Sequence, residues 1–242
     1  MHHLFLLTAA DTSGPPNNAW SIILSGGATG IAIMLLLVLV SVVALALVVE
    51  HLLTIRRSIL MPEGLAEQVG MQLANKQIAE ADKRCQQTPS ALAVVMRAGL
   101  AETPGGWQAV EKGMEEALAE QSARLLRKID YLSVIGNIAP MIGLLGTVFG
   151  MIFAFQEVAN TQGAARAAEL ASGIYQALVT TVGGLLVAIP SLAAFAVFRN
   201  RVDQLIAETG QQAQQAVFPI KRAFQQPSMS APPAQPPTAG AH

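Results

Sequence analysis

The sequence predicts an all-α, polytopic membrane protein with three transmembrane helices, the second and third of which extend into the cytoplasm as long helices. Hydrophobic residues make up 52% of its 242 residues and charged residues only 13%, whereas soluble domains carry roughly 25% charged residues. Three apolar runs contain no Asp, Glu, Lys, Arg or His, and each is long enough to cross a hydrocarbon core of about 30 Å. A helical periodicity also leads into the second run and continues after the third.

The first predicted span covers residues 28–49 and follows an N-terminal segment, 1–27, that has no Lys or Arg. A signal peptide would need a basic start and a shorter apolar core, so we interpret 28–49 as a transmembrane helix. The segment begins MHHLFLLTAADTSGPP, which is compatible with a processed targeting piece but is too short to span a membrane.

The segment between the first two spans, residues 50–130, is polar and rich in helix-forming residues. The stretches QQTPS and ETPGGW interrupt it with Pro and Gly, which predicts two or three cytoplasmic helices. From Trp107 onward, WQAVEKGMEEALAEQSARLLRKIDYL keeps a helical period. We therefore expect this helix to join the second span, residues 131–155, without a break.

The second span is followed by a short outer loop, residues 156–173, and by the third span, residues 174–198. The stretch RNRVDQLIAETGQQAQQAVFPIKRAF prolongs the third span as a cytoplasmic helix within residues 199–224, with a regular pattern that ends at Pro219. The tail, residues 225–242, is rich in Pro and Ala and almost uncharged, so it is predicted to be disordered.

Positive charge is distributed unevenly around the spans. Of the 15 Lys and Arg residues, ten lie between the first and second spans, four follow the third, one (Arg166) lies between the second and third, and none precedes the first. Lys and Arg mark the cytoplasmic segments of membrane proteins. The N-terminus is therefore predicted to lie outside and the C-terminus in the cytoplasm.

The sequence contains no motif for catalysis or cofactor binding. A glycine-rich phosphate loop ending in Lys-Ser or Lys-Thr, H-E-x-x-H and G-x-S-x-G are all absent. The single cysteine, Cys85, excludes an intrachain disulfide, and the four histidines are too scattered for a metal site. A net charge of −1 does not favour nucleic acid. We expect no enzymatic activity, cofactor, metal or nucleic-acid partner, and contact with membrane lipid.

Small residues follow one helix face in each of the last two spans. In the second span the spacings are 4, 3, 4, 3 and 4, at Gly136, Pro140, Gly143, Thr147, Gly150 and Ala154. In the third they are 4, 3 and 4, at Ala177, Thr181, Gly184 and Ala188. Such stripes let helix backbones approach closely in lipid. A three-span monomer would leave the stripes facing lipid, so we expect the chain to form a ring. The residues expected to pack helices are Gly136, Pro140, Gly143, Gly146, Gly150, Gly184 and Pro190.

Polar side chains accompany these stripes. Thr147 lies eight residues before Phe155, and Thr181 lies seven after Ile174, so antiparallel helices place both hydroxyls roughly 10–12 Å below the outer ends of their spans. One threonine can simply bond a carbonyl of its own helix. Three threonines and an amide at similar depth instead favour a surface that faces water or other protein. The candidates for an ion pathway are Thr147, Thr181, Thr180 and Gln176.

The motifs APMIGLLGTVFGM and GIYQALVTTVGGLLVAIPSLAAF resemble those of the ExbB, TolQ and MotA stator superfamily, most closely its ExbB/TolQ branch. The resemblance covers all three spans, the long segment after the first and both helix extensions. It implies a homopentamer in the inner membrane of a diderm bacterium, with the N-terminus in the periplasm and a pore lined by the second and third spans. The pore would hold the single-span helices of an ExbD/TolR-like dimer, and proton flow would drive motion delivered through a TonB- or TolA-like protein. In that family the threonines of the GLLGTV and TT motifs face the pore, which carries over to Thr147 and Thr181, with Thr180 beside them.

Gln176 departs from the family pattern. Members of the best-known type carry a glutamate where this chain reads GIYQAL, and an amide cannot titrate. The spans therefore hold no group that exchanges a proton near neutral pH, and threonine hydroxyls can only order water or donate to an acceptor. The titratable group must come from a partner helix, as the aspartate of an ExbD-like protein would supply it.

Two other functions remain open. A MotA-like flagellar stator shares the pore but usually has four spans, and a structural helix-bundle scaffold would use the stripes for packing without conducting ions. An independent secondary transporter is disfavoured because the sequence shows no internal repeat and no broken helix pair. The sequence does not distinguish TonB-type uptake from Tol-type envelope maintenance or another system, and it leaves the ion open.

Overall fold

The structure is a computed structural model that describes residues 27–160 and 167–225. These residues form helices joined by short turns, without a β-strand. Three of the helices are long and apolar enough to cross a membrane, which confirms the predicted all-α, three-span class. In chain order the elements are α2 (Gly27–Thr54), α3 (Arg57–Leu60), α4 (Leu65–Ala74), α5 (Ile78–Gln87), α6 (Ala91–Ala101), the 3-10 helix η1 (Thr103–Gly105), α7 (Trp107–Asn160) and α8 (Ala167–Gln225).

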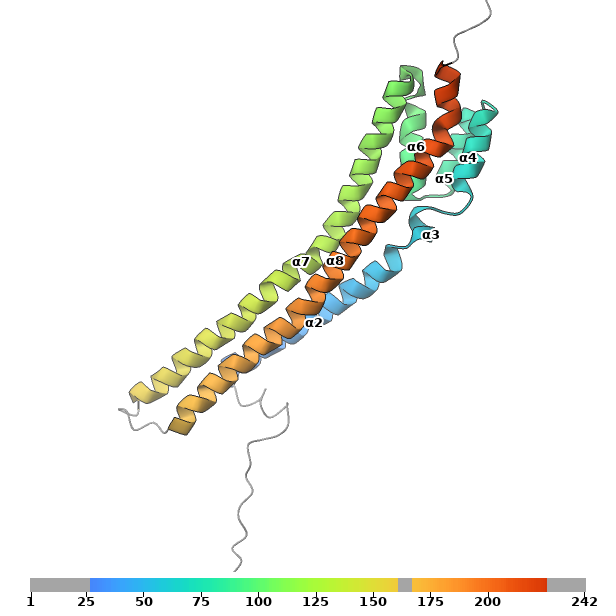
Figure 1. Cartoon of the computed structure of the whole chain (residues 1–242). Helices are drawn as coiled ribbons and strands as arrows, with labels where there is room; N and C mark the ends of the chain where they lie inside the picture. Colours follow the sequence, from blue (N-terminus) through green and yellow to red (C-terminus); the bar gives the residue numbers. More distant parts are fainter. Residues whose placement is uncertain (1–26, 161–166, 226–242) are drawn as a thin grey trace, which may run out of the picture. The chain divides into compact units, whose positions relative to one another are not determined.

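The chain divides into two compact units. The first, here called the apolar unit, contains the described residues up to 48 and those of 131–195. The second, here called the polar unit, contains 49–130 and the described residues from 196 onward. Each of the three long helices contributes a part to both units, whereas α3 to α6 belong to the polar unit alone (Figure 1).

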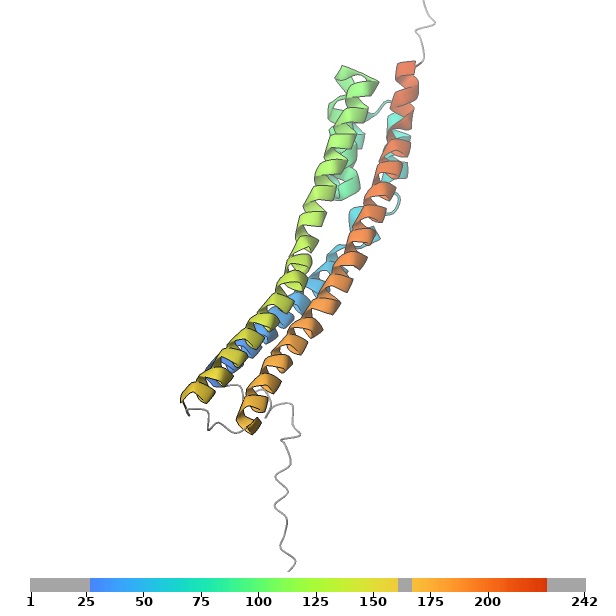
Figure 2. The same cartoon turned by 60° about the vertical axis from the view of Figure 1, so that its left-hand side comes forward.

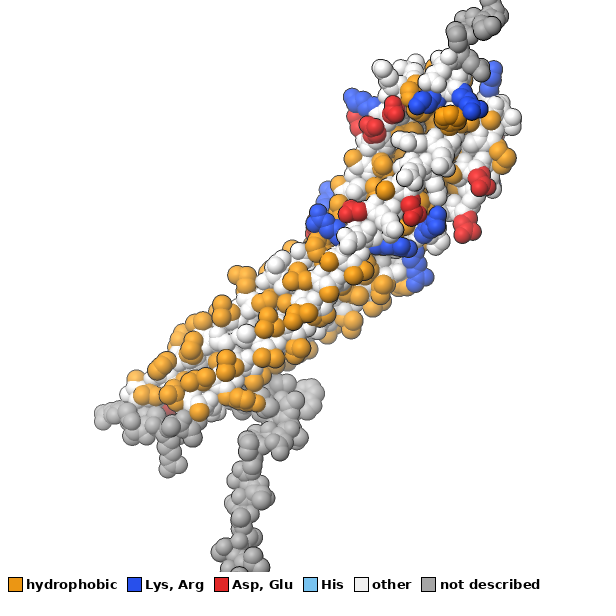
Figure 3. Space-filling model, in the orientation of Figure 1, with side chains coloured by type: hydrophobic (Ala, Val, Ile, Leu, Met, Phe, Trp, Pro, Cys, Tyr) orange, Lys and Arg blue, Asp and Glu red, His pale blue; other side chains and the backbone are white. Residues whose placement is uncertain are grey.

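In the apolar unit, α7 and α8 run side by side in opposite directions and α2 packs against them (Figures 1 and 2). A small core joins Ile33 and Leu37 of α2 to Ala139 of α7 and Ala188 of α8. Most large apolar side chains of this unit point outward instead, and they cover its visible face (Figure 3). This outward-facing apolar surface is the pattern expected of helices that contact lipid or other membrane helices.

Local sequence signals explain the breaks between helices in the polar unit. The predicted break at QQTPS is confirmed, because α5 ends at Gln87 and the hydroxyl of Ser90 caps α6 by accepting a hydrogen bond from Ala93 N at 3.2 Å. The break at ETPGGW is confirmed as well. There Gly106 has φ 85°, a left-handed conformation that glycine adopts without strain, and α7 begins at the next residue.

The predicted fusion of the Trp107 helix with the second span is confirmed, since α7 is one helix of 54 residues. The helices extend farther into the segment 156–173 than expected, because α7 continues to Asn160 and α8 begins at Ala167. The expected end of the regular helix at Pro219 is wrong. Helix α8 continues to Gln225, and Val217 and Ile220 of this last part are buried within the polar unit. Apart from Gly27 and Gln225, the segments 1–27 and 225–242 lie outside the described residues.

Charged pairs lie on the surface of the polar unit. Arg97 Nε donates to Asp82 Oδ1 at 2.8 Å, and this hydrogen bond holds the pKa of Asp82 below its usual value of 3.8. Next to this pair, the buried thiol of Cys85 has a pKa raised to about 11, mainly by burial and further by the charge of Asp82. Arg57 Nε lies 3.5 Å from Glu208 Oε2 and so connects the residues after α2 to α8.

Candidate functional site

The α7–α8 contact within the apolar unit is built from small residues. A Cβ atom on Gly143 would lie 2.8 Å from the backbone oxygen of Thr180, and one on Gly184 would lie 2.6 Å from that of Ala139. Both distances are shorter than real Cβ contacts, so only glycine allows these two backbones to touch. We call this contact the seam. Its residues are Gly136, Ala139, Gly143, Gly146, Gly150 and Ala154 of α7 and Gly173, Ala177, Thr180, Gly184 and Ala188 of α8.

The seam corrects one step of the sequence argument. The stripes were expected to face lipid in a single chain and so to require other copies, but most of their small residues face each other within the chain. The glycines predicted to pack helices all lie in the seam. By contrast, Pro140 is half-buried and Pro190 is exposed. A ring therefore cannot be argued from the small residues alone.

The seam divides the neighbouring threonines Thr180 and Thr181 into different environments. Thr180 is 5% exposed, and its hydroxyl lies 2.7 Å from the carbonyl oxygen of Ala177 and 3.1 Å from that of Gly143 across the seam. Thr181 is half-buried, and its hydroxyl reaches the same Gly143 oxygen at 3.3 Å. Both hydroxyls thus lie within hydrogen-bond distance of one carbonyl, although the single proton of the Thr180 hydroxyl is shared with the nearer oxygen of Ala177. Thr180 is the more buried residue of the two.

Thr147 lies at the edge of the seam, one residue after Gly146. It is half-buried, and its hydroxyl donates to the carbonyl oxygen of Leu144 at 2.7 Å, within its own helix. Gly143, which contacts Thr181, is one helical turn away, or about 6 Å along α7. Thr147 and Thr181 therefore lie roughly one turn apart, and no direct bond joins them among the described residues. Gln176, the remaining predicted pathway residue, is half-buried on α8.

The sequence reasoning passed over a second amide in these spans, Asn137. Its side chain is exposed, and Nδ2 donates to the backbone oxygen of Ser133 at 2.8 Å. It also missed His51, which is 3% exposed at the end of α2. The Nε2 atom of His51 lies 3.0 Å from the carbonyl oxygen of Lys128, and its ring centroid is 5.7 Å from that of Phe198. The signal for both was a polar residue interrupting or ending an apolar run.

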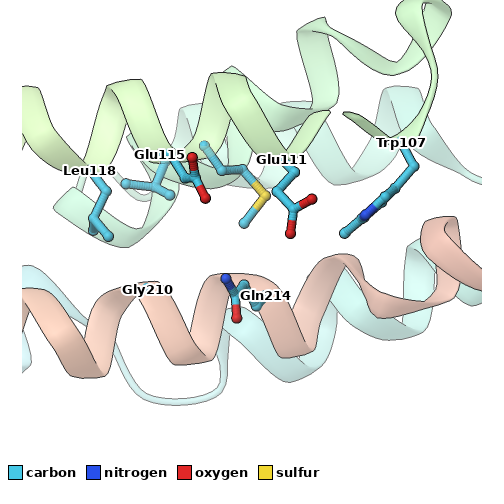
Figure 4. Close-up of a pocket in the computed structure, with 8 residues that line it drawn as sticks. Trp107, Glu111, Glu115, Leu118, Gly210 and Gln214 are labelled. Carbon is cyan, nitrogen blue, oxygen red and sulfur yellow. The ribbon is translucent and has the colours of Figure 1, made fainter. Parts of the chain in front are cut away.

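The polar unit contains a small pocket between α7 and α8. Trp107, Glu111 and Leu118 of α7 line it together with Gly210 and Gln214 of α8 (Figure 4). Its volume of about 30 Å³ has room for only one or two water molecules. This space therefore belongs to the packing of the helices. Over residues 27–160 and 167–225, no group of three or more His, Cys, Asp and Glu side chains is placed to hold a metal ion.

A known protein family matches the part of the sequence that contains the seam. The sequence model of the MotA/TolQ/ExbB proton channel family matches residues 87–211, slightly more than half of the chain. This stretch includes α6, all of α7 and most of α8, and therefore every predicted pathway residue.

Individual relatives match over a shorter stretch. The chain is 34% identical over 99 residues to the Tol-Pal system protein TolQ of Pseudomonas aeruginosa, which covers 41% of this chain and 42% of that protein. It is 38% identical over 91 residues to the biopolymer transport protein exbB1 of Vibrio cholerae, covering 38% and 40%. It is 34% identical over 105 residues to the biopolymer transport protein ExbB of Salmonella typhimurium, covering 43% of each. The chain thus matches about two fifths of the length of these relatives.

Proposed function

This chain belongs to the ExbB/TolQ branch of the MotA/TolQ/ExbB proton channel family, and we propose that it is the pore-forming subunit of a proton-driven motor in the bacterial inner membrane. In this proposal it works with an ExbD/TolR-like single-span partner and energises transport of the TonB or Tol type through a TonB- or TolA-like protein. The names of its relatives, a Tol-Pal system protein and biopolymer transport proteins, support this class of function.

One observation carries the proposal. The two helices that form the seam have no Asp, Glu, Lys, Arg or His over residues 131–155 and 174–198, yet the half-buried Thr147 and Thr181 lie within about one turn of each other. Hydroxyls without a neighbouring charge fit a pathway whose proton-binding group enters from outside the chain.

The hydrogen bonds indicate how these hydroxyls act. Thr147 donates to the carbonyl of Leu144, and this bond within its own helix can be given up at little cost. The hydroxyl can then donate to a carboxylate or to water, and in its resting orientation its lone pairs accept from a protonated carboxyl group. The Thr147 hydroxyl can therefore donate to a partner carboxylate and accept a hydrogen bond from the same group when it is protonated. The Thr181 hydroxyl can bond a carboxyl group in the same two ways once it releases the Gly143 oxygen across the seam. The buried Thr180 bonds Ala177 in its own helix and reaches Gly143 across the seam.

The orientation proposed for the chain follows from its charges. Ten of the 15 Lys and Arg residues lie in 50–130 and four follow the third span, so the polar unit is assigned to the cytoplasm and the N-terminus to the periplasm.

A pentameric ring is proposed on the family resemblance and on Asn137, which exposes an amide within a span. Polar side chains in a bilayer tend to face other protein or water, and a neighbouring copy would shield Asn137 from lipid.

Proton flux into liposomes tests the proposal. Vesicles containing the chain, its single-span partner or both would receive a membrane potential, and a trapped pH indicator would report proton entry. We expect flux only when both are present, and its loss when the partner's carboxylate is changed to an amide. Flux through the chain alone would contradict the need for a partner carboxylate. An intact complex without any flux would favour the scaffold, and rescue of a flagellar motor would favour a MotA-like stator.

A further inference from the structure

A groove in the polar unit lies between the end of α2 and the part of α8 that begins this unit. Its floor is made by Ile55 and Phe198, which are 8% and 6% exposed, and its rims by Leu52 and Val197, which are 55% and 66% exposed. The groove is open to the surroundings on one side, and its volume is about 430 Å³, within the range of roughly 300–1,000 Å³ typical of sites that bind small molecules. The groove is therefore large enough for part of a lipid.

One end of the groove is formed by the cationic side chain of Arg201. Val197, Arg201 and Gln204 follow spacings of 4 and 3 on one face of α8, so the apolar rim leads directly to the guanidinium group and the amide. Within the part of the chain that the structure describes, Arg201 has neither a hydrogen bond nor an ion pair. Arg56 and Arg57 differ from it, because Arg56 donates to the carbonyl of Leu52 at 3.0 Å and Arg57 pairs with Glu208.

The floor of the groove is held in place from behind. His51 is buried, and its Nε2 is 3.0 Å from the carbonyl oxygen of Lys128 on α7, which fixes the orientation of the ring. The ring centroid of Phe198 lies 5.7 Å from that of His51, in a tilted contact. Because α2, α7 and α8 all contribute to this contact, the apolar floor is formed before any ligand arrives. A preformed floor lowers the ordering cost of binding.

The groove also lies at the level where the apolar runs end. The third charge-free run ends at Phe198, and the first ends at Val49, three residues before Leu52. The segments 50–57, 124–130 and 199–203 flank the same ends of the three runs and hold seven Lys or Arg against three Asp or Glu. Such a surplus of basic residues beside a membrane attracts anionic headgroups.

We propose that this groove binds one anionic phospholipid, with its phosphate on Arg201 and the first part of an acyl chain over Ile55 and Phe198. Arginine suits this role because its fork of N–H groups bonds two phosphate oxygens at once. The uncharged floor and rims exclude water from the ester and acyl portion, which a free phosphate does not possess. The proposal requires only that the three apolar helices cross a membrane, and it is independent of proton conduction.

Native mass spectrometry of the purified full chain tests the proposal. The chain in mild detergent would receive phosphatidylglycerol or phosphatidylcholine with the same acyl chains, and the retained lipid would be counted. We expect preferential retention of phosphatidylglycerol. Arg201→Gln should weaken it about fivefold, which is the conversion of about 1 kcal/mol per basic residue, and Arg201→Lys should restore most of it. Val197→Trp should fill the groove and reduce retention of both lipids.

The matched control is Arg124→Gln, which removes an equal charge flanking the same ends of the runs from a residue that does not line the groove. It should retain phosphatidylglycerol as the unaltered chain does. Equal loss in Arg124→Gln and Arg201→Gln, or full retention in Arg201→Gln, would overturn the proposal. Displacement of the lipid by an equal concentration of glycerol 3-phosphate would assign the groove to a free phosphate compound. A Leu52→Cys variant whose new thiol stays shielded from a soluble thiol reagent after lipid removal would assign the groove to a second copy of the chain.

Discussion

Replacement of Gly184 by alanine is expected to force the seam open. The new Cβ would lie 2.6 Å from the backbone oxygen of Ala139 and 3.2 Å from Cα of Gly143, whereas ordinary contact begins near 3.4 Å, so the deficit is roughly 0.8 Å. Both obstacles are backbone atoms, and no side-chain rotation relieves them. The helices must therefore part, which would also lengthen the 3.1 Å bond between Thr180 Oγ1 and the Gly143 oxygen.

The expected cost follows from these contacts. Overpacking of this kind typically costs about 1–3 kcal/mol, and a weakened hydrogen bond between membrane helices adds about 0.6 kcal/mol. The higher helix propensity of alanine offsets up to about 1 kcal/mol of this loss of stability. We therefore expect Gly184→Ala to lower the free energy of unfolding by about 1–3 kcal/mol.

Reversible unfolding in mixed micelles with increasing dodecyl sulfate, followed by circular dichroism, measures this change. Gly183→Ala is the matched control, because its Cβ would meet only side-chain atoms of Leu37 and Met34, at 3.5 Å and beyond. This variant should be as stable as the unaltered chain, or slightly more stable. Equal stability of Gly184→Ala and Gly183→Ala would refute the close approach of the two backbones.

Three further predictions concern the polar unit. The Arg97 hydrogen bond holds the pKa of Asp82 below 3.8, so its stabilisation is present above pH 3.8 and is lost as the pH falls through the lowered value. The side chains of Arg97 and Asp82 are 47% and 36% exposed, so Asp82→Asn should lower the free energy of unfolding by less than about 1 kcal/mol. The thermal midpoints of the unaltered chain and of Asp82→Asn should converge in acid. A difference between the two midpoints that stays constant with pH would contradict this. Cys85, with its pKa raised to about 11, should react slowly with Ellman's reagent at pH 8 until the chain unfolds, and rapid labelling of the native chain would disprove its burial. The free energy of unfolding should also fall from pH 9 to pH 11, because the thiol loses its proton at a lower pH in the unfolded chain than in the folded chain. Ser90→Ala should lower the free energy of unfolding by about 0.5–2 kcal/mol through loss of the α6 cap, and Ser90→Gly by less; an alanine variant of unchanged stability would show that the cap is not used.

The helices and their breaks were predictable because their signals are local. Runs without charge define the spans, and a Pro or Gly cluster defines each break, as at Gly106, where the left-handed backbone requires glycine. The continuation through Pro219 was not predictable from such signals. It depends on the burial of Val217 and Ile220, which are contacts between residues far apart in the sequence.

The partner of the small-residue stripes was not predictable either. A stripe indicates that another backbone comes close, but it does not say whether that backbone belongs to the same chain. The structure pairs Gly143 with Gly184 inside the chain. Similarly, the sequence treats Thr180 and Thr181 alike, yet adjacent helical positions differ by about 100° in direction, so one hydroxyl is buried in the seam and the other lies at its edge.

Proton flux through variants at Thr147 and Thr181, measured with the partner present, tests the proposed pathway most directly. Valine at either position keeps the shape and removes the hydroxyl, and Thr209→Val is the control because that buried hydroxyl bonds Leu205 in the polar unit. We predict that each valine variant assembles normally but conducts less, that Thr147→Ser conducts nearly as well as the unaltered chain, and that the double variant loses less than the sum of the single changes. Full flux through the Thr147→Val, Thr181→Val double variant would contradict the account.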